Sequence, residues 1–142
     1  MDREAALRRI SALEQIIQDL RNDIMAGDEP GAESVDLGRQ GTWRFGRLQE
    51  LHAHVEHLTG VMALFDLCAE RSPETVTFGE VLERSGLTEK QQGGDHSRLS
   101  WVAKRLFGEK LWPLECWQAA DGVMHYRMPT MIARWWQAIR RQ

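Results

Sequence analysis

The sequence predicts a mainly α-helical fold with one small β-hairpin and a separate helix at the N-terminus. Apolar residues recur at three- and four-residue spacing along most of the chain, and β-favouring segments flank an Asp-Gly pair near residue 121. A glycine-rich, acidic stretch separates the first helical pattern from the rest. The chain has 142 residues, of which 42% are hydrophobic and 27% charged, so we expect one globular domain with an appendage.

The first helical pattern follows the heptad repeat of a coiled coil. Isoleucine occupies the a positions and leucine most d positions, which favours a parallel dimer, so we assign residues 1–24 to a dimerisation helix. Leu7 and Ile16 widen the apolar stripe beyond a strict seam, which leaves another helix or a higher oligomer open. The other alternative is an amphipathic helix packed on its own domain, because three heptads are marginally stable alone. The predicted dimerisation residues are Ile10, Leu13, Ile17, Leu20 and Ile24.

Residues 25–41 predict a flexible linker, because they hold four glycines, one proline and several acidic residues without any hydrophobic periodicity. We therefore expect the folded domain to span residues 42–142. Its first helical pattern begins after Thr42, which we expect to cap it, and ends at Ser72-Pro73 because proline disfavours helical geometry in the preceding residue. Gly60 lies inside this pattern and predicts either a kink or a division into two helices.

Two further helices follow a short β-favouring stretch at residues 76–78. The first ends in Gly86, a typical glycine C-cap, and the second opens with Thr88 and Gln91 at the spacing of a capping box. The second helix is expected over residues 88–107.

A hairpin and a closing helix complete the chain. Residues 113–118 and 123–128 flank Asp121-Gly122, and a two-residue turn there places Trp117 opposite Tyr126. The closing helix follows Pro129. Because Trp135 and Trp136 are adjacent, we expect only one of them to face the core.

This order of elements is that of a winged helix-turn-helix, a fold that places its third helix in the major groove of DNA. Over residues 60–137 the chain also resembles a family of small, largely uncharacterised actinobacterial winged-helix proteins. The resemblance implies DNA binding by analogy of fold and supplies no known target. The stretches that carry it are Ser85-Gly86-Leu87-Thr88, Ala103-Lys104-Arg105-Leu106-Phe107-Gly108, Trp112-Pro113 and Tyr126-Arg127-Met128.

The charge distribution agrees with a nucleic-acid partner for the second half. Residues 1–86 carry 9 basic and 16 acidic side chains, whereas residues 87–142 carry 9 and 5. A helical projection turns one cationic face of residues 88–107 outward, with Arg98 placed to reach a guanine edge and Lys104 to contact phosphate. The predicted DNA-binding residues are Lys90, Gly94, Ser97, Arg98, Trp101, Lys104, Arg105 and Arg127.

Three features depart from this pattern. Gln92 and Asp95 project onto the buried face beside Gly93-Gly94, so the helix has either a loose first turn or a restart with Asp95 as its N-cap. The hairpin tip holds no Arg or Lys for the minor groove. Trp101 on an outward face favours contact with another protein, a second subunit or the closing helix.

The sequence holds no catalytic signature, so we expect no enzyme activity and no cofactor. Glu50, His54 and His57 share a helical face, but surface histidines explain them better than a metal site does. Cys68 and Cys116 lie in apolar patterns and are expected to be buried, reduced thiols.

Together these patterns predict a homodimeric, sequence-specific double-stranded DNA-binding protein that regulates transcription. We expect it in the cytoplasm, associated with the nucleoid when bound to DNA, and without a membrane partner because no apolar run is long enough to span a bilayer. The alternative is a protein-interaction adaptor that uses the same fold, with Trp101 and the C-terminal helix as the contact surface.

Overall fold

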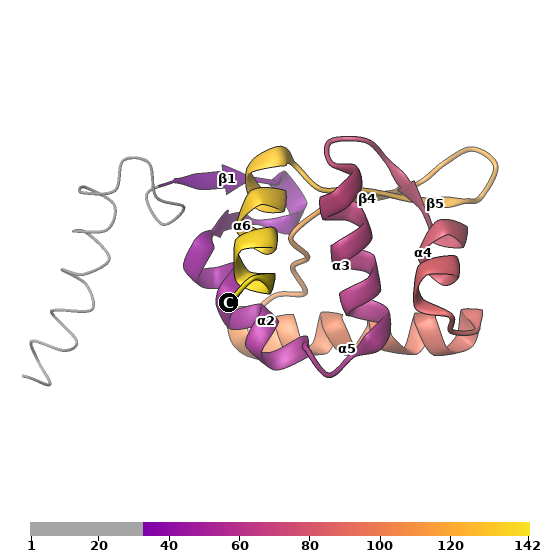
Figure 1. The fold of residues 1–142 in the computed structure, drawn as a ribbon, viewed down its shortest axis with the longest axis horizontal. Coiled ribbons are helices and arrows are strands. Elements are labelled where there is room, and N and C mark those ends of the chain that lie inside the picture. Colours follow the sequence, from indigo (N-terminus) through magenta and orange to yellow (C-terminus); the bar gives the residue numbers. More distant parts are fainter. Residues whose placement is uncertain (1–32) are drawn as a thin grey trace, which may run out of the picture. The chain divides into compact units, whose positions relative to one another are not determined.

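The computed structural model describes residues 33–142, so the predicted coiled coil at residues 1–24 lies outside the described part. The described chain is mainly helical with small antiparallel sheets, which confirms the coarse fold class (Figure 1). In chain order its elements are β1 (Ser34–Asp36), the 3₁₀ helix η2 (Gly38–Gln40), β2 (Thr42–Arg44), α2 (Phe45–Val55), α3 (Thr59–Arg71), β3 (Val76–Thr77), α4 (Phe78–Ser85), α5 (Glu89–Phe107), β4 (Glu115–Gln118), β5 (Met124–Arg127) and α6 (Thr130–Arg140).

The compact unit begins at Val35, so residues 35–41 of the predicted linker belong to it. Here β1 pairs with β2, and Trp43 of β2 is fully buried with its Nε1 donating to the carbonyl oxygen of Gln40 at 2.8 Å. The prediction that Thr42 caps a helix is wrong, because Thr42 lies in β2 and Arg44 occupies the N-cap position of α2 without a side-chain hydrogen bond. Burial of Trp43 explains why the chain is extended at this point.

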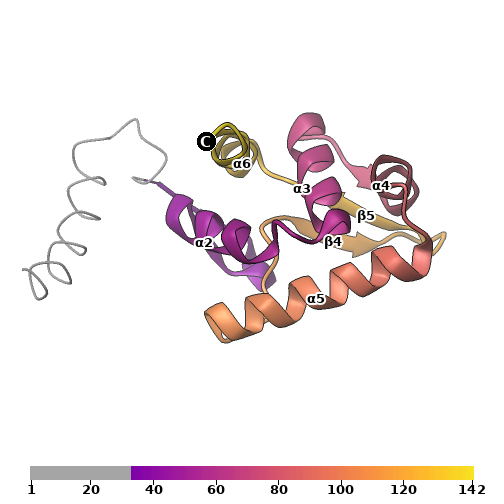
Figure 2. The same cartoon turned by 60° about the horizontal axis from the view of Figure 1, so that its bottom comes forward.

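The long helical pattern is divided into α2 and α3, with Gly60 as the second residue of α3. The predicted end is confirmed, since α3 stops at Arg71 immediately before Ser72-Pro73. Helix α3 is the central element: its residues are buried over most of its length, and it packs against α4, α5 and α6 (Figures 1 and 2).

The two predicted caps around α4 and α5 are confirmed. Gly86 ends α4 in the left-handed conformation with φ of 74°, and Thr88 and Gln91 form the reciprocal capping box that opens α5. Helix α5 runs without interruption through Gly93-Gly94, so it does not restart at Asp95.

The hairpin forms, but its predicted register is wrong by one residue. Trp117 lies opposite His125, and Cys116 lies opposite Tyr126. The turn is longer than two residues, because Ala119 donates its N–H to the carbonyl of Val123, and Gly122 adopts a φ of 85°. This is a three-residue loop with a glycine in the left-handed region, the next most common hairpin connection.

The three-stranded sheet has the order β3-β5-β4, so the short strand before α4 pairs with the second strand of the hairpin. Helix α6 then closes the core. The expectation that only one of its adjacent tryptophans faces inward is wrong: Trp135 and Trp136 are each 1% exposed. Because α6 packs against both α2 and α3, two side chains 100° apart can both be covered.

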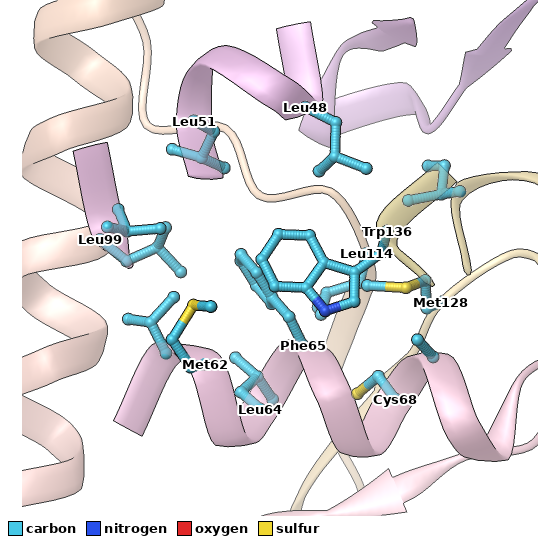
Figure 3. Close-up of a cluster of buried hydrophobic side chains, with 14 of the residues drawn as sticks. Leu48, Leu51, Met62, Leu64, Phe65, Cys68, Leu99, Leu114, Met128 and Trp136 are labelled. Carbon is cyan, nitrogen blue, oxygen red and sulfur yellow. The ribbon is translucent and has the colours of Figure 1, made fainter. Parts of the chain in front are cut away.

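Figure 3 shows how Trp136 fills the centre of the core. Its ring meets Phe65 edge-on at a centroid separation of 5.1 Å, and its Nε1 donates to Asp66 Oδ1 at 2.7 Å. Leu48 and Leu51 from α2 and Leu99 from α5 line the same region (Figure 3). Helices α2, α3, α5 and α6 therefore share one core, which fixes the position of α5.

Candidate nucleic-acid interface

Helix α5 runs along one side of the compact unit and leaves one face uncovered along its length (Figure 2). Its buried face contains Gln92, Asp95, His96, Leu99, Val102 and Ala103. The predicted outward face agrees with this, because all its members on α5 are exposed except Gly94, which is half-buried. The exposed members are Lys90, Ser97, Arg98, Trp101, Lys104 and Arg105.

A polar cluster fixes α5 to the first turn of α3. The Gly60 amide donates to Asp95 Oδ2 at 2.7 Å, and Gln92 Nε2 donates to the Gly60 carbonyl at 2.9 Å. A Cβ atom at Gly60 would lie only 2.8 Å from Asp95 Oδ2 and 2.9 Å from Gln92 Oε1. Glycine is therefore what permits this close approach, and the cluster explains the polar residues that depart from the usual buried face.

His96 continues this cluster into an aromatic enclosure. The residue is 9% exposed, and its ring meets Phe78, Trp112 and Tyr126 edge-on with centroid separations of 5.3 to 5.9 Å. Burial lowers the pKa of His96 to about 4, so the imidazole is neutral at physiological pH. Gln92 Nε2 lies 2.8 Å from His96 Nε2, and we assign the amide as donor and the ring nitrogen as acceptor.

Arg98 is linked to the same cluster from the solvent side. Its Nη1 donates to Asp95 Oδ1 at 2.9 Å, so the Asp95 carboxylate joins the backbone of α3 to the guanidinium. The Arg98 side chain is 66% exposed, whereas that of Asp95 is 11% exposed. Within residues 33–142, Arg98 Nε and Nη2 have no hydrogen-bond partner.

Trp101 lies on the exposed face between Arg98 and Lys104 and is 58% exposed. Lys110 Nζ lies 4.3 Å from its ring centroid and Lys104 Nζ lies 5.5 Å from it, which are both cation–π distances. Lys110 is not among the predicted residues, because it follows the end of α5 and a helical projection does not place it. The face is thus more cationic than the helix alone indicates.

The predicted cation of the hairpin is paired within the molecule. Arg127 Nη2 lies 2.8 Å from Glu115 Oε1, directly across the strands. On the same face, Trp117 stacks on His125 at 5.7 Å and is 38% exposed. The hairpin therefore presents an aromatic pair and a neutralised arginine rather than free positive charge.

Neither cysteine of the described residues is an activated thiol. Burial raises the pKa of Cys68 to about 12 and also raises that of Cys116, so neither thiol ionises readily at neutral pH. Within residues 33–142, no group of three or more His, Cys, Asp or Glu side chains is arranged to hold a metal ion. An open groove between α3 and α6 includes Asp66, but this carboxylate already accepts hydrogen bonds from Trp136 and Arg140.

A search of the same described part for membrane-spanning segments finds no helix that combines sufficient length with sufficient apolar character. The resemblance to actinobacterial winged-helix proteins stays a prediction. The roles of the predicted DNA-binding residues also stay predictions, since exposure on α5 alone does not test a role. Comparison of the chain with family models, with curated proteins and with solved structures gives no match in any of the three.

Proposed function

We propose that this protein is a homodimeric, sequence-specific double-stranded DNA-binding protein that regulates transcription. In this proposal the segment from α3 to β5 is a winged helix-turn-helix, with α4, the Gly86 turn and α5 as the helix-turn-helix and β4–β5 as the wing. The element order and the pairing of β3 with β5 support the fold assignment. The observation that carries the function is the uncovered cationic face of α5.

Unpaired cations on this face would supply the affinity for DNA. Lys90, Lys104 and Arg105 form no ion pair with any residue in the range 33–142. Each is therefore available to neutralise a phosphate and release a condensed counterion. Lys110 adds a fourth charge beside Trp101.

The proposed dimer would read two half-sites together. Its basis is the heptad seam of residues 10–24, which lies outside the described residues. Two copies of α5 would then contact successive major grooves, and the two half-sites would be related by the symmetry of the dimer. The wing would contribute little, because its tip holds no Lys or Arg and Arg127 is paired with Glu115.

A fluorescence-anisotropy titration of the full chain with a 30-base-pair duplex tests DNA binding. We expect binding at about 50 mM salt and a fall in affinity up to about 200 mM, with a log–log slope of about −0.9 for each phosphate contacted. The variant Lys104→Glu/Arg105→Glu should bind much more weakly and reduce the slope by about two.

A charge-matched control distinguishes this surface from general electrostatics. Arg134→Glu/Arg141→Glu makes the same change in net charge at two exposed arginines at the C-terminal end, in and just after α6, which lies across the compact unit from α5 (Figure 2). It should bind almost as the wild type does. Absence of binding at low salt, or equal losses in the two variants, would overturn the proposal.

A protein-interaction adaptor is the second candidate, and the exposed aromatics favour it. Trp101 on α5 and the stacked Trp117–His125 pair on the hairpin both reach solvent. The C-terminal helix adds less than expected, since Trp135 and Trp136 are buried. Two results together would favour the adaptor. The wild type would bind no duplex at low salt, and the Trp101→Ala/Trp117→Ala variant would lose a protein partner that Lys104→Glu/Arg105→Glu retains.

A further inference from the structure

We propose that Arg98 reads a guanine in the major groove and that Asp95 is the residue that positions it. This inference rests on the proposed DNA binding by α5 and assigns different tasks to the cations of that surface. The neighbouring cations hold the backbone of the duplex, whereas the Asp95–Arg98 pair supplies sequence discrimination.

The Asp95 carboxylate is a fixed anchor for the guanidinium. It is largely buried, and its Oδ2 accepts a 2.7 Å hydrogen bond from the Gly60 amide at the start of α3. Its Oδ1 accepts Arg98 Nη1 at 2.9 Å. Since the carboxylate is attached to two helices of one core, it restricts the orientation of Arg98 before any ligand binds.

The remaining donors of Arg98 suit a base edge. With Nη1 directed to Asp95, the edge formed by Nε and Nη2 is unpaired among residues 33–142. Two parallel N–H donors on one planar edge match the O6 and N7 acceptors of guanine in the major groove.

The adjacent carboxylate also makes Arg98 a poor phosphate ligand compared with its neighbours. Asp95 offsets the positive charge of Arg98 and repels a nearby phosphate, whereas Lys104 and Arg105 have no acidic partner in the described chain. An oriented guanidinium loses less side-chain freedom on binding, which favours a directional contact. Arg98 is therefore suited to specificity more than to affinity.

The test begins with selection of duplexes from a random-sequence pool by the full chain, which should enrich a guanine in each half-site. The selected duplex is then prepared with 7-deazaguanine at that guanine, which removes N7 alone. Wild-type binding should weaken about tenfold, the scale of a bidentate base contact. Arg98→Ala should bind the two duplexes within about twofold of each other.

Two further variants separate positioning from charge. Asp95→Asn keeps an oxygen acceptor for the Gly60 amide but loses the carboxylate partner of Arg98, so the discrimination against 7-deazaguanine should fall to about threefold. Lys104→Ala should weaken both duplexes equally and keep the tenfold ratio, while lowering the salt slope by about one. Should Asp95→Asn fold poorly, the pairing of Arg98→Ala with 7-deazaguanine still decides whether Arg98 reads the guanine.

The outcomes distinguish this inference from the proposed function. Loss of all duplex binding at low salt overturns both. Binding without an enriched guanine, or an Arg98→Ala variant that still discriminates tenfold against 7-deazaguanine, overturns the role of Arg98 and leaves DNA binding by α5 intact. Unchanged discrimination in a well-folded Asp95→Asn variant overturns the positioning role of Asp95.

Discussion

Replacing Gly60 with alanine should weaken the attachment of α3 to α5. The new Cβ would lie 2.8 Å from Asp95 Oδ2, 2.9 Å from Gln92 Oε1 and 3.0 Å from Asp95 Cβ. Because the last of these atoms sits next to the backbone, rotation of a flexible side-chain end cannot relieve the contact. The two helices must move apart, or both hydrogen bonds to Gly60 must lengthen.

The loss of stability can be estimated from the two hydrogen bonds that Gly60 makes. The 2.7 Å bond to the Asp95 carboxylate is worth about 1.5–3 kcal/mol, and the 2.9 Å bond from Gln92 is worth about 0.5–1.5 kcal/mol. Alanine returns up to about 1 kcal/mol of helix propensity. We therefore expect a net loss of about 1–3 kcal/mol in the free energy of unfolding, and a melting temperature lower by several degrees.

Gly46→Ala is the matched control. Gly46 is the second residue of α2, as Gly60 is of α3, and a Cβ there meets nothing within 4 Å. Urea denaturation of the two variants, monitored by tryptophan fluorescence, should show that Gly46→Ala is at least as stable as the wild type and that Gly60→Ala is clearly less stable. Equal stabilisation by both alanines would refute the close approach of α3 and α5.

Three further predictions concern single groups. Burial lowers the pKa of His96 to about 4, below the 6.5 of a free imidazole. Because the unfolded chain then binds a proton that the folded chain does not, the free energy of unfolding should fall by about 2–3 kcal/mol as the pH drops from 6.5 towards 4. A normal His96 pKa in an NMR titration of the folded protein would contradict this. Trp136→Phe removes the 2.7 Å hydrogen bond to Asp66 and part of the core volume, so it should lower the free energy of unfolding in urea by about 2–4 kcal/mol. A loss below about 1 kcal/mol would argue against that bond. Thr88→Ala removes the side-chain acceptor of the α5 capping box and should lower stability by about 1 kcal/mol, with Thr88→Ser close to the wild type in the same assay.

Local signals predicted the boundaries of the second half well. The Thr88 and Gln91 capping box and the Gly86 C-cap depend on residues within four positions of one another, so they can be recognised in the sequence. The exposed face of α5 could be predicted equally well, because a helical projection needs only the spacing of apolar residues. The DNA-binding roles that we assign to this face remain predictions.

Features that depend on distant partners were not predictable in this way. Gln92 and Asp95 looked misplaced because Gly60, whose backbone each of them hydrogen-bonds, lies 32 and 35 positions earlier in the chain. Trp135 and Trp136 are both covered because α6 lies against two helices, which no local pattern reveals. The hairpin register depended on the backbone conformation of its turn, which the Asp-Gly pair alone did not determine.

The contact between Gly60, Gln92 and Asp95 also constrains how this sequence can diverge. Any larger side chain at position 60 requires shorter partners at 92 and 95, so the three positions should change together in descendants of this chain. A glycine followed 32 and 35 residues later by glutamine and aspartate is therefore a compact fingerprint for recognising relatives whose overall similarity has faded. Such relatives should share the relative orientation of α3 and α5 even where their surfaces differ.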